Sequence, residues 1–265
     1  MVQLGMPFLL ENDSAEAAAA LCAELGLDFV ELNMSFPLCQ PEHISAAEQN
    51  ALKEKYGIYF TFHLHEEMDP CTFCAPVRKA WLEVARQSIV LAREIGAPTV
   101  NLHWLRGVYV TLPHSRDFLY HRYAAEYRQN VLEFRALCEE ASRGQVRVCI
   151  ENTEEGGWEP FRQEAIETLL SSPVFGLTLD VGHDALSKYA DEPFYQKHAG
   201  HLRHMHLHDA TARQCHMPLG AGELNIAALL RRADDAGARA VLEIKTVDAL
   251  RQSVSYLMER GLFHA

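Results

Sequence analysis

The chain has 265 residues, a length that one large α/β domain can fill, and 48% of them are hydrophobic, which is enough for a substantial core. Its formal net charge of −12 argues against nucleic acid as a partner, because affinity for DNA comes largely from Lys and Arg side chains that neutralise phosphates. No apolar run approaches the length of a membrane-spanning helix, and the amino terminus lacks the pattern of an export signal, so we expect a soluble cytoplasmic protein without a membrane partner.

Strand-like apolar runs alternate with amphipathic helical segments along the chain. Eight strands are predicted, at Gln3–Phe8, Asp28–Asn33, Ile58–His65, Thr99–Trp104, Arg147–Asn152, Gly176–Val181, His204–His208 and Arg239–Lys245. Asp13-Ser-Ala-Glu16 resembles a capping box before a helix over 17–25. A longer helix is predicted over Ala75–Ile95, ending at Gly96.

Eight strand–helix repeats without a linker or low-complexity break predict one α/β domain over residues 1–265, a single (β/α)8 TIM barrel. In such barrels catalytic residues come from the carboxyl ends of the strands and the loops that follow. A doubly wound open sheet is the alternative. It is the weaker one, because no Gly-rich phosphate loop follows the first strand and because an open sheet would spread the polar strand ends along a line.

The seven cysteines, an odd number without regular spacing, favour reduced thiols over a disulfide framework. Cys22, Cys138 and Cys149 lie in apolar patterns, where cysteine behaves as a small core residue. The Cys71-x-x-Cys74 pair has neither a second such pair nor a thioredoxin-like context, so we interpret it as structural or incidental.

The most informative segment is His204-Met-His-Leu-His-Asp209. Side chains alternate along a strand, so its three histidines project to one face. Other predicted strands also end in side chains of the metal-ligand type, at Phe60–His65, Asn101–His103, Glu151–Thr153, Asp180–His183 and Glu243–Lys245. Barrel closure would bring these ends together around one axis.

Four of these side chains, Glu151, Asp180, His206 and Glu243, end the fifth to eighth predicted strands. Three carboxylates and one imidazole suit Mn²⁺, Zn²⁺ or Mg²⁺. Carboxylates that converge in a barrel mouth repel one another unless a cation or basic partners neutralise them. The sequence therefore predicts a divalent metal site.

His63 and His103 end the third and fourth strands, next to Glu151 in barrel order, and with a bridging Glu151 they can hold a second metal. A single strand histidine is more often a satisfied polar group, and the pattern leaves His65 open as the ligand in place of His63. His183 and His216 are predicted to hold a third metal or to bind substrate oxygens.

The remaining strand histidines, His65, His204 and His208, are predicted to orient the ligands. Lys245 alternates with Glu243 and has two interpretations, a charge partner of the carboxylates or a cation for a phosphate or developing oxyanion. Leu219-Gly-Ala-Gly-Glu223 lacks the Lys-Ser/Thr of a phosphate loop, so it is predicted to be a turn that shapes the loop carrying His216.

Five segments in order, ENT at 151–153, LDVGH at 179–183, HMHLHD at 204–209, HMPLGAGE at 216–223 and LEIK at 242–245, resemble the xylose isomerase-like barrel superfamily. This superfamily includes sugar isomerases and epimerases and the endonuclease IV group, also called AP endonuclease family 2. The resemblance covers nearly the whole chain and is specific for the fold but not for the substrate. Both branches imply a metal held by Glu151, Asp180, His206 and Glu243.

The two branches differ in their further ligands. Resemblance to the epimerases implies one metal, Glu151 and Glu243 as proton carriers, and often an arginine near His216. Resemblance to endonuclease IV implies three zinc ions for phosphodiester hydrolysis, with added histidines at the positions of His63, His103, His183 and His216, all of which this chain has. It departs at Gln214, where that group has an acidic ligand, and this weakens the third site.

The sequence argues against DNA as a substrate, since the chain is acidic and shows no basic stripe with interleaved aromatic residues. FHLHEEMDP at 62–70, GVYVTLP at 107–113 and FGLTLDVGHD at 175–184 resemble the cobamide-remodelling hydrolases of the superfamily, which cut the phosphoester of a corrinoid nucleotide loop.

The leading hypothesis is therefore a metal-dependent phosphoester hydrolase of a small molecule, with a cobamide nucleotide loop as the first candidate. Two or three Zn or Mn ions would supply a metal-activated hydroxide as the nucleophile, and Glu151, Glu243 and Lys245 would be the catalytic residues. The alternative is a sugar or sugar-phosphate isomerase or epimerase with one divalent metal and a glutamate proton shuttle. A metal-holding binding protein is the non-enzymatic alternative, and the sequence gives no oligomeric state.

Overall fold

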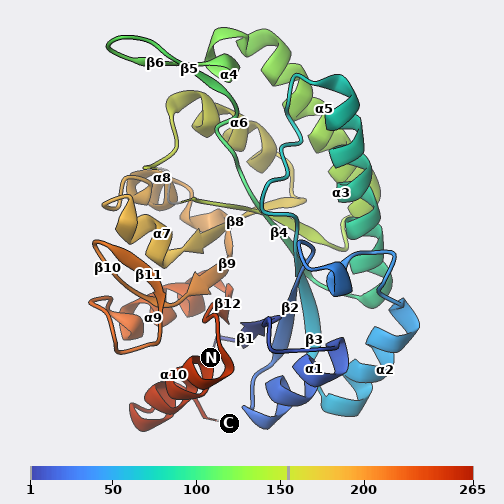
Figure 1. Ribbon diagram of the computed structural model, residues 1–265, viewed down its shortest axis with the longest axis vertical. Coiled ribbons are helices and arrows are strands. Elements are labelled where there is room, and N and C mark those ends of the chain that lie inside the picture. The colour runs from blue at the N-terminus through green and yellow to red at the C-terminus, as the bar shows by residue number, and fades with distance from the viewer. Residues whose placement is uncertain (1, 154–155, 265) are drawn as a thin grey trace.

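The computed structural model describes residues 2–153 and 156–264, which form a closed parallel barrel surrounded by helices (Figure 1). The barrel strands are β1 (Leu4–Pro7), β2 (Phe29–Asn33), β3 (Tyr59–His63), β4 (Thr99–His103), β7 (Arg147–Glu151), β8 (Phe175–Asp180), β9 (Leu202–Leu207) and β12 (Arg239–Leu242). Their order around the barrel is β1-β12-β9-β8-β7-β4-β3-β2. The predicted (β/α)8 TIM barrel is confirmed, and each predicted strand is present with slightly different ends.

The register of the parallel strands sets which residues lie at the same level. His103 on β4 pairs with Glu151 on β7, and Asp180 on β8 pairs with His206 on β9. On the other side of the barrel, Asn33 of β2 pairs with His63 of β3. Because these residues end their strands or lie close to the ends, closure of the barrel gathers their side chains at its carboxyl-terminal mouth.

Helices cover the outside of the barrel: α1 (Ala15–Glu24), α2 (Ala46–Tyr56), α3 (Ala75–Ile95), α4 (Leu119–Arg122), α5 (Ala124–Ser142), α6 (Pro160–Leu170), α7 (Val181–Leu186), α8 (Glu192–Lys197), α9 (Ile226–Ala236) and α10 (Val247–Glu259), with 3-10 turns at Pro37–Cys39 and Ala199–His201. Helix α3 has the predicted bounds and ends at Gly96, whose φ of 73° completes its last turn. The predicted capping box is misplaced by one residue, because Ser14 is the N-cap and accepts the N–H of Ala17, while Glu16 pairs with Lys55 at 2.6 Å.

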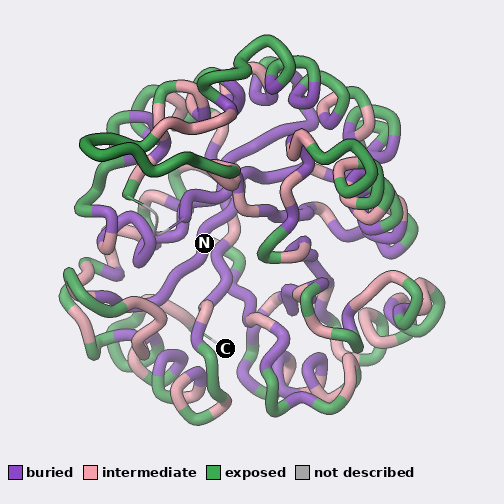
Figure 2. Tube along the Cα trace, turned by 45° about the horizontal axis from the view of Figure 1, so that its top comes forward, coloured by how far each residue is buried: buried purple, intermediate pink, exposed green. Residues whose placement is uncertain are grey.

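Buried residues gather on the barrel strands and on the helix faces that cover them (Figure 2). Between sheet and helices the core is aromatic and aliphatic, as where Phe134 of α5 packs against Phe175 of β8 with ring centroids 6.1 Å apart. None of the seven cysteines, all of which lie in the described part of the chain, forms a disulfide, and those predicted to be core residues are buried. In the Cys71-x-x-Cys74 pair only Cys71 is buried, which agrees with an incidental pair.

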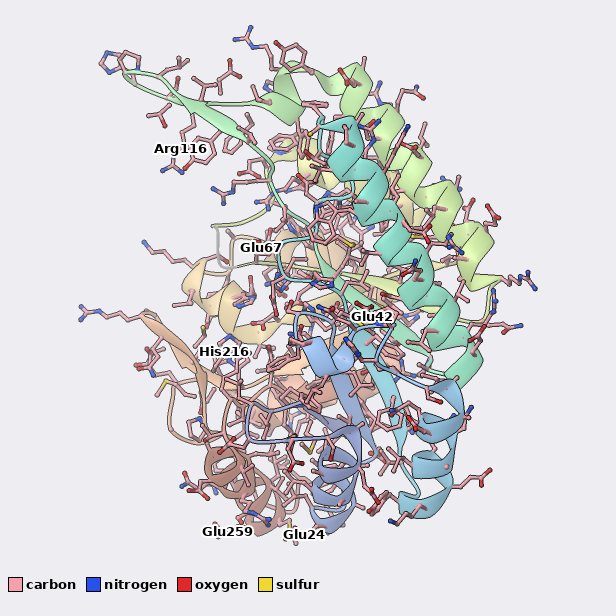
Figure 3. The ribbon with its side chains drawn as sticks, turned by 45° about the vertical axis from the view of Figure 1, so that its right-hand side comes forward. Glu24, Glu42, Glu67, Arg116, His216 and Glu259 are labelled. Atoms are coloured by element: carbon pink, nitrogen blue, oxygen red, sulfur yellow. The ribbon has the colours of Figure 1, made fainter. Side chains whose placement is uncertain are left out.

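Two antiparallel hairpins follow strands at the mouth: β5 (Tyr109–Thr111) with β6 (Arg116–Phe118), and β10 (Asp209–Thr211) with β11 (Gln214–Met217). The first projects away from the barrel (Figure 1), and the second packs against α7. Figure 3 shows His216 of the second hairpin far from Glu24 and Glu259, which lie at the opposite end of the barrel. Within residues 2–153 and 156–264, no helix is both long and apolar enough to cross a membrane.

Gly5 of β1 is required by its close approach to Phe29, because a Cβ atom added at Gly5 would lie 2.5 Å from carbons of that ring. Phe29 is fully buried and stacks on Tyr59 with centroids 5.0 Å apart, so its ring has little room to move. We expect Gly5→Ala to lower the free energy of unfolding by about 1–3 kcal/mol, measured by urea denaturation. The control is Gly200→Ala, where the added Cβ meets no described atom within 4 Å and the change should stay below about 0.5 kcal/mol. Equal stability of the two variants would contradict this prediction.

Candidate metal centre and active site

The eight predicted metal ligands lie together in the barrel mouth. Each has a side-chain donor atom no more than 3.6 Å from a donor of another, in the set His63, His103, Glu151, Asp180, His183, His206, His216 and Glu243. They come from six strands or from the segments just after them. The structure thus brings together all the residues that the sequence selected, and their role as ligands stays a prediction.

At the centre of the site, one nitrogen of His206 faces three carboxylates. His206 Nδ1 lies 3.0 Å from Glu151 Oε1, 3.3 Å from Glu243 Oε2 and 3.9 Å from Asp180 Oδ2. Burial raises the pKa of Glu151, but the positive charges of His206 and His103 outweigh burial and hold it well below its usual range. Glu151 therefore stays ionised, and its negative charge in the mouth must be balanced by positive groups.

The donor set fits a divalent cation. Glu243 Oε2 is buried and has no hydrogen-bond partner among the described residues, although His206 and His216 lie near it. A buried carboxylate oxygen without a hydrogen bond is costly unless a cation or a water satisfies it. Three carboxylates and one imidazole within this space are suitable donors for a metal of the zinc or manganese type.

A second donor group lies beside the first. His63 Nε2 is 3.2 Å from Glu151 Oε2, and His103 Nε2 is 3.5 Å from Glu151 Oε1. Nδ1 of His63 lies 2.6 Å from the carbonyl oxygen of Leu64, and Nδ1 of His103 lies 3.3 Å from Glu66 Oε2. Because these oxygens can only accept, each Nδ1 keeps its proton, and Nε2, which faces Glu151, is the nitrogen of each ring that a metal could use. This arrangement can hold a second metal, with Glu151 shared.

The structure places His63 rather than His65 in this group, since the His65 ring packs instead against Trp81 with centroids 5.7 Å apart. Strand β12 ends at Leu242, so Glu243 and Lys245 follow it instead of lying within it. Lys245 Nζ lies 2.7 Å from Glu243 Oε1, as the charge-partner interpretation predicts. The side chain of Lys245 nevertheless remains 56% exposed. This exposure leaves its ammonium group accessible to an anionic substrate.

His183 is positioned by the start of α7. Asp180 ends β8 and caps this helix, with Oδ1 accepting the N–H of His183 at 2.6 Å. His183 Nδ1 lies 3.1 Å from the carbonyl oxygen of Asn152, which leaves Nε2 for a ligand. A Cβ atom on Gly182 would lie 2.0 Å from Cε1 of His208, so the close approach of this ring requires glycine.

His208 contacts both Asp180 and the loop that carries His216. Its Nδ1 accepts the N–H of His216 at 2.8 Å, and its Nε2–H therefore donates to Asp180, 3.2 Å away. Asp209 next to it accepts the N–H groups of Gly220 and Leu224, at 2.9 and 3.0 Å, and so shapes the turn predicted over 219–223. These contacts hold in place the loop that carries His216.

His216 itself has a left-handed backbone with φ of 53°, a strained conformation for a residue with a side chain. Its Nδ1 lies 3.3 Å from the carbonyl oxygen of Glu243. Burial lowers the pKa of His216 to about 4, with the nearby His208 and Lys245 adding to the effect, so its imidazole is neutral at pH 7. A neutral imidazole is the form that binds metals.

Sequence reasoning missed Glu31 of β2, which is buried inside the barrel. Its Oε1 lies 2.8 Å from His206 Nε2, its Oε2 lies 2.8 Å from His204 Nε2, and Thr61 Oγ1 donates to it at 3.0 Å. The charged residue within the apolar Phe29–Asn33 strand was the available signal. Since a carboxylate only accepts, Glu31 keeps the proton of His206 on Nε2 and leaves Nδ1 free to face the mouth carboxylates.

The family model described as "Xylose isomerase-like TIM barrel" matches residues 19–260. The chain therefore belongs to the xylose isomerase-like TIM barrel family, as its motifs indicated. Comparison with curated proteins gives no match.

Solved structures share the fold over almost their full length. A D-tagatose 3-epimerase-like protein has a TM-score of 0.73 at 20% identity, with 98% of this chain and 97% of that chain covered. The 3-keto-D-glucoside 4-epimerase from E. coli has 0.73 at 15% identity, covering 98% and 100%. The IolI protein, described with a bound zinc atom, has 0.73 at 15% identity, covering 98% of both chains. At these identities the likeness shows the fold alone.

We expect Glu31→Gln to weaken binding of the first metal equivalent by about 10–100-fold, because an amide can accept from only one of the two histidines and sets its NH₂ group against the other. Competition between the protein and a chromophoric chelator for Zn²⁺ measures this affinity. Glu16→Gln is the control, since Glu16 is exposed and contacts Lys55 and the Tyr56 hydroxyl at the surface, away from the mouth. Unchanged zinc affinity in folded Glu31→Gln would exclude a role for Glu31 in orienting His206.

Proposed function

We propose that the chain is a metal-dependent phosphoester hydrolase that acts on a small molecule. The observation that carries this proposal is the group of His63, His103 and Glu151 beside the four-donor site. An isomerase that uses one metal does not need two further histidines oriented toward a carboxylate of its site. A multi-metal hydrolase does need them, because it holds both the nucleophile and the phosphate.

We assign the ligands to two neighbouring metal positions. Glu151, Asp180, His206 and Glu243 would hold one divalent ion, and His63 and His103 would hold another together with Glu151. Zinc or manganese suits this mixture of imidazole and carboxylate donors. When bound, such ions lower the pKa of a water and neutralise phosphate oxygens.

The side chains themselves contribute positioning and charge. Glu151 is fully buried, so its two oxygens are available to metal ions and histidines and not to bulk water. Glu243 keeps 15% of its side chain exposed and can exchange a proton with a group in the mouth. Lys245 at its side offers an ammonium group to the phosphate of an incoming substrate.

The net charge of the chain and the shape of its mouth support a small molecule as the substrate. The net charge of −12 does not suit DNA. The segment 107–113, one of those that resemble cobamide-remodelling hydrolases, enters the projecting β5–β6 hairpin, where Val108, Val110 and Leu112 are exposed. An apolar hairpin that follows a mouth strand suits a substrate larger than a sugar, and a corrinoid nucleotide loop is the first candidate.

A sugar isomerase or epimerase is the second candidate, and the solved structures favour it over hydrolysis, since two of those reported above are described as an epimerase or epimerase-like. In this case one metal and two glutamates, Glu151 and Glu243 on either side of His206, would move a proton between carbons. The number of bound metals separates this candidate from the hydrolase.

We expect the protein, after removal of metals and reconstitution with zinc, to retain at least two equivalents per chain, one for each donor group around Glu151. Elemental analysis after gel filtration measures this number. A single retained equivalent would favour the epimerase.

Zinc binding at pH 7 should release protons. Burial lowers the pKa of His63, but its hydrogen bond with Glu151 and the charges of Glu66 and Glu151 outweigh burial and raise it to about 9. His63 is therefore protonated at pH 7 and must lose a proton to bind a metal, so zinc affinity should rise as the pH increases toward about 9. Calorimetry in two buffers with different ionisation enthalpies measures the released protons, and buffer-independent heats would contradict this expectation.

His103→Ala should remove one zinc equivalent and lower phosphoester hydrolysis by at least about 100-fold, because it deletes a donor to the second position. The fold should survive, since His103 ends its strand in the mouth outside the core. His43→Ala, at an exposed histidine, is the control for stability and activity. Near-wild-type turnover of His103→Ala would exclude this residue from the reaction.

The same preparations can be tested against a cobamide, a model phosphodiester, an abasic DNA duplex and a set of ketoses. We expect cleavage of the cobamide or the model phosphodiester and no cleavage of the duplex. Efficient ketose epimerisation without phosphoester cleavage would overturn the proposed function.

A further inference from the structure

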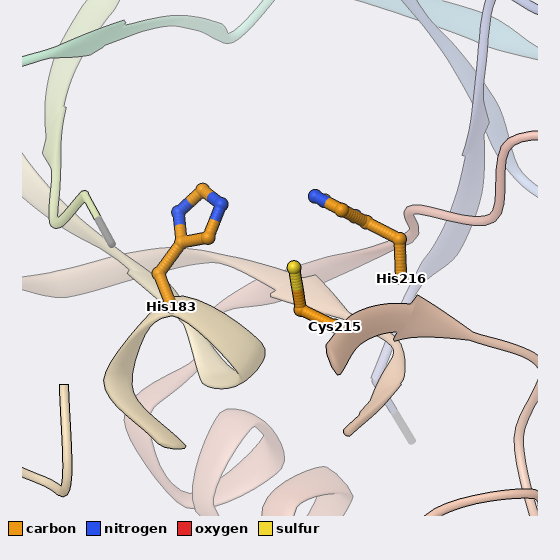
Figure 4. A group of neighbouring side chains, drawn as sticks. All are labelled: His183, Cys215 and His216. Atoms are coloured by element: carbon orange, nitrogen blue, oxygen red, sulfur yellow. The ribbon is translucent and has the colours of Figure 1, made fainter. Parts of the chain in front are cut away.

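A third donor group lies at the rim of the mouth and includes a cysteine that the sequence analysis did not select. One ring nitrogen each of His183 and His216 and the Sγ atom of Cys215 all lie within 4.8 Å of one another. Figure 4 shows the cysteine sulfur between the two rings, which reach it from α7 and from β11. The ring centroids are 5.5 Å apart and the planes meet at 88°, so the rings do not stack on each other.

Backbone carbonyls orient both imidazoles for metal binding. Nδ1 of His183 lies 3.1 Å from the oxygen of Asn152, and Nδ1 of His216 lies 3.3 Å from the oxygen of Glu243. A carbonyl oxygen can only accept, so each Nδ1 carries the ring proton. The lone pair of each ring is then on Nε2, the usual arrangement behind a metal-binding histidine.

An irregularity in the hairpin brings Cys215 to the same side as His216. In a regular strand Gln214 and His216 would share one face and Cys215 would face the other way. The pairing of β10 with β11 shifts between Asp209 and Thr211, and His216 has a left-handed backbone. Gln214 is exposed as a result.

Glycine makes the close approach of the hairpin possible. A Cβ atom added to Gly182 of α7 would lie 2.9 Å from Cβ of Cys215. Any larger residue would push the cysteine away from α7 and from His183. The bulge, the left-handed backbone of His216 and Gly182 together place the Cys215 thiol beside the two rings, whereas resemblance to endonuclease IV implies an acidic ligand at position 214.

We propose that His183, Cys215 and His216 hold a zinc ion, with the thiolate of Cys215 taking the place of the carboxylate that Gln214 does not supply. Two imidazoles and one thiolate are donors typical of zinc, and they leave its fourth position open. The thiol proton passes to solvent when the ion binds. Donors around tetrahedral zinc lie about 3.5 Å apart, so a contraction of roughly 1 Å brings the three atoms into bonding range.

This open position belongs to a donor group that lies beside the four-donor site. His216 Nδ1 lies 3.6 Å from Glu243 Oε2, and His183 Nδ1 lies 3.6 Å from Asp180 Oδ2, so this group adjoins the four-donor site. A phosphate oxygen or a water is the ligand that fits there. This role rests on the proposed function, whereas the binding of zinc by the cysteine does not.

The test uses Co²⁺ as a spectroscopic substitute for zinc in the full-length, reduced and metal-free protein. A thiolate bound to Co²⁺ gives a charge-transfer band in the near ultraviolet, and we expect this band in the wild type. Cys215→Ser should lose the band and one metal equivalent. Cys215→Asp should lose the band but keep the equivalent, because a carboxylate can replace the thiolate. Cys74→Ser, at an exposed cysteine, is the matched control and should behave as the wild type.

A charge-transfer band that persists in Cys215→Ser, or the lack of any band in wild type saturated with Co²⁺, would overturn the proposal. Alkylation of the wild type gives a readout that needs no variant: zinc should protect Cys215 from iodoacetamide, as seen by peptide mass spectrometry, and equal labelling with and without zinc would also overturn it. If the band appears but no phosphoester is cleaved, the proposed function fails and the cysteine site stands.

Discussion

The buried contact between His206 and the carboxylates around it is the interaction on which the site depends. Glu31 Oε1 accepts a hydrogen bond from Nε2 of the His206 ring at 2.8 Å. The other ring nitrogen, Nδ1, lies 3.0 Å from Glu151 Oε1 and 3.3 Å from Glu243 Oε2. Buried carboxylates are costly without a positive partner, so these strands tolerate their acidic ends only because histidines, and in our proposal metal ions, lie between them. The same contact sets which histidine nitrogen carries the proton.

Around this centre, the backbone rather than further charge sets the geometry. Asp180 ends β8 and caps α7, so that one residue joins the strand to the helix that carries His183. Asp209 accepts hydrogen bonds from the N–H groups of Gly220 and Leu224 in the turn after the second hairpin. Gly182 has no Cβ atom, which allows the His208 ring to lie against α7. These local contacts fix the positions of the loops that follow the strands, and a metal site needs such contacts if its donors are to be preorganised.

The fold does not choose between hydrolysis and epimerisation, because one barrel architecture supports many reactions and the solved structures resemble this chain at 20% identity or less. The side chains in the mouth carry the distinction. His63 and His103 turn their Nε2 atoms toward Glu151, with both Nδ1 atoms engaged by acceptors. That orientation is common in ligand histidines, and our proposal of a second metal position rests on it.

The sequence alone determined the eight strands, the barrel and the residues at its mouth, because strand alternation and the polar ends of apolar runs are local patterns. It could not determine that Glu31 contacts His204 and His206, since these residues are more than 170 positions apart and meet only through barrel closure. Resemblance to endonuclease IV also implied an acidic ligand at position 214, where this chain has Gln214. Only the tertiary structure, through a shifted hairpin register and a left-handed His216, decided that Cys215 lies beside His183 and His216, because a bulge interrupts the alternation of side chains along a strand.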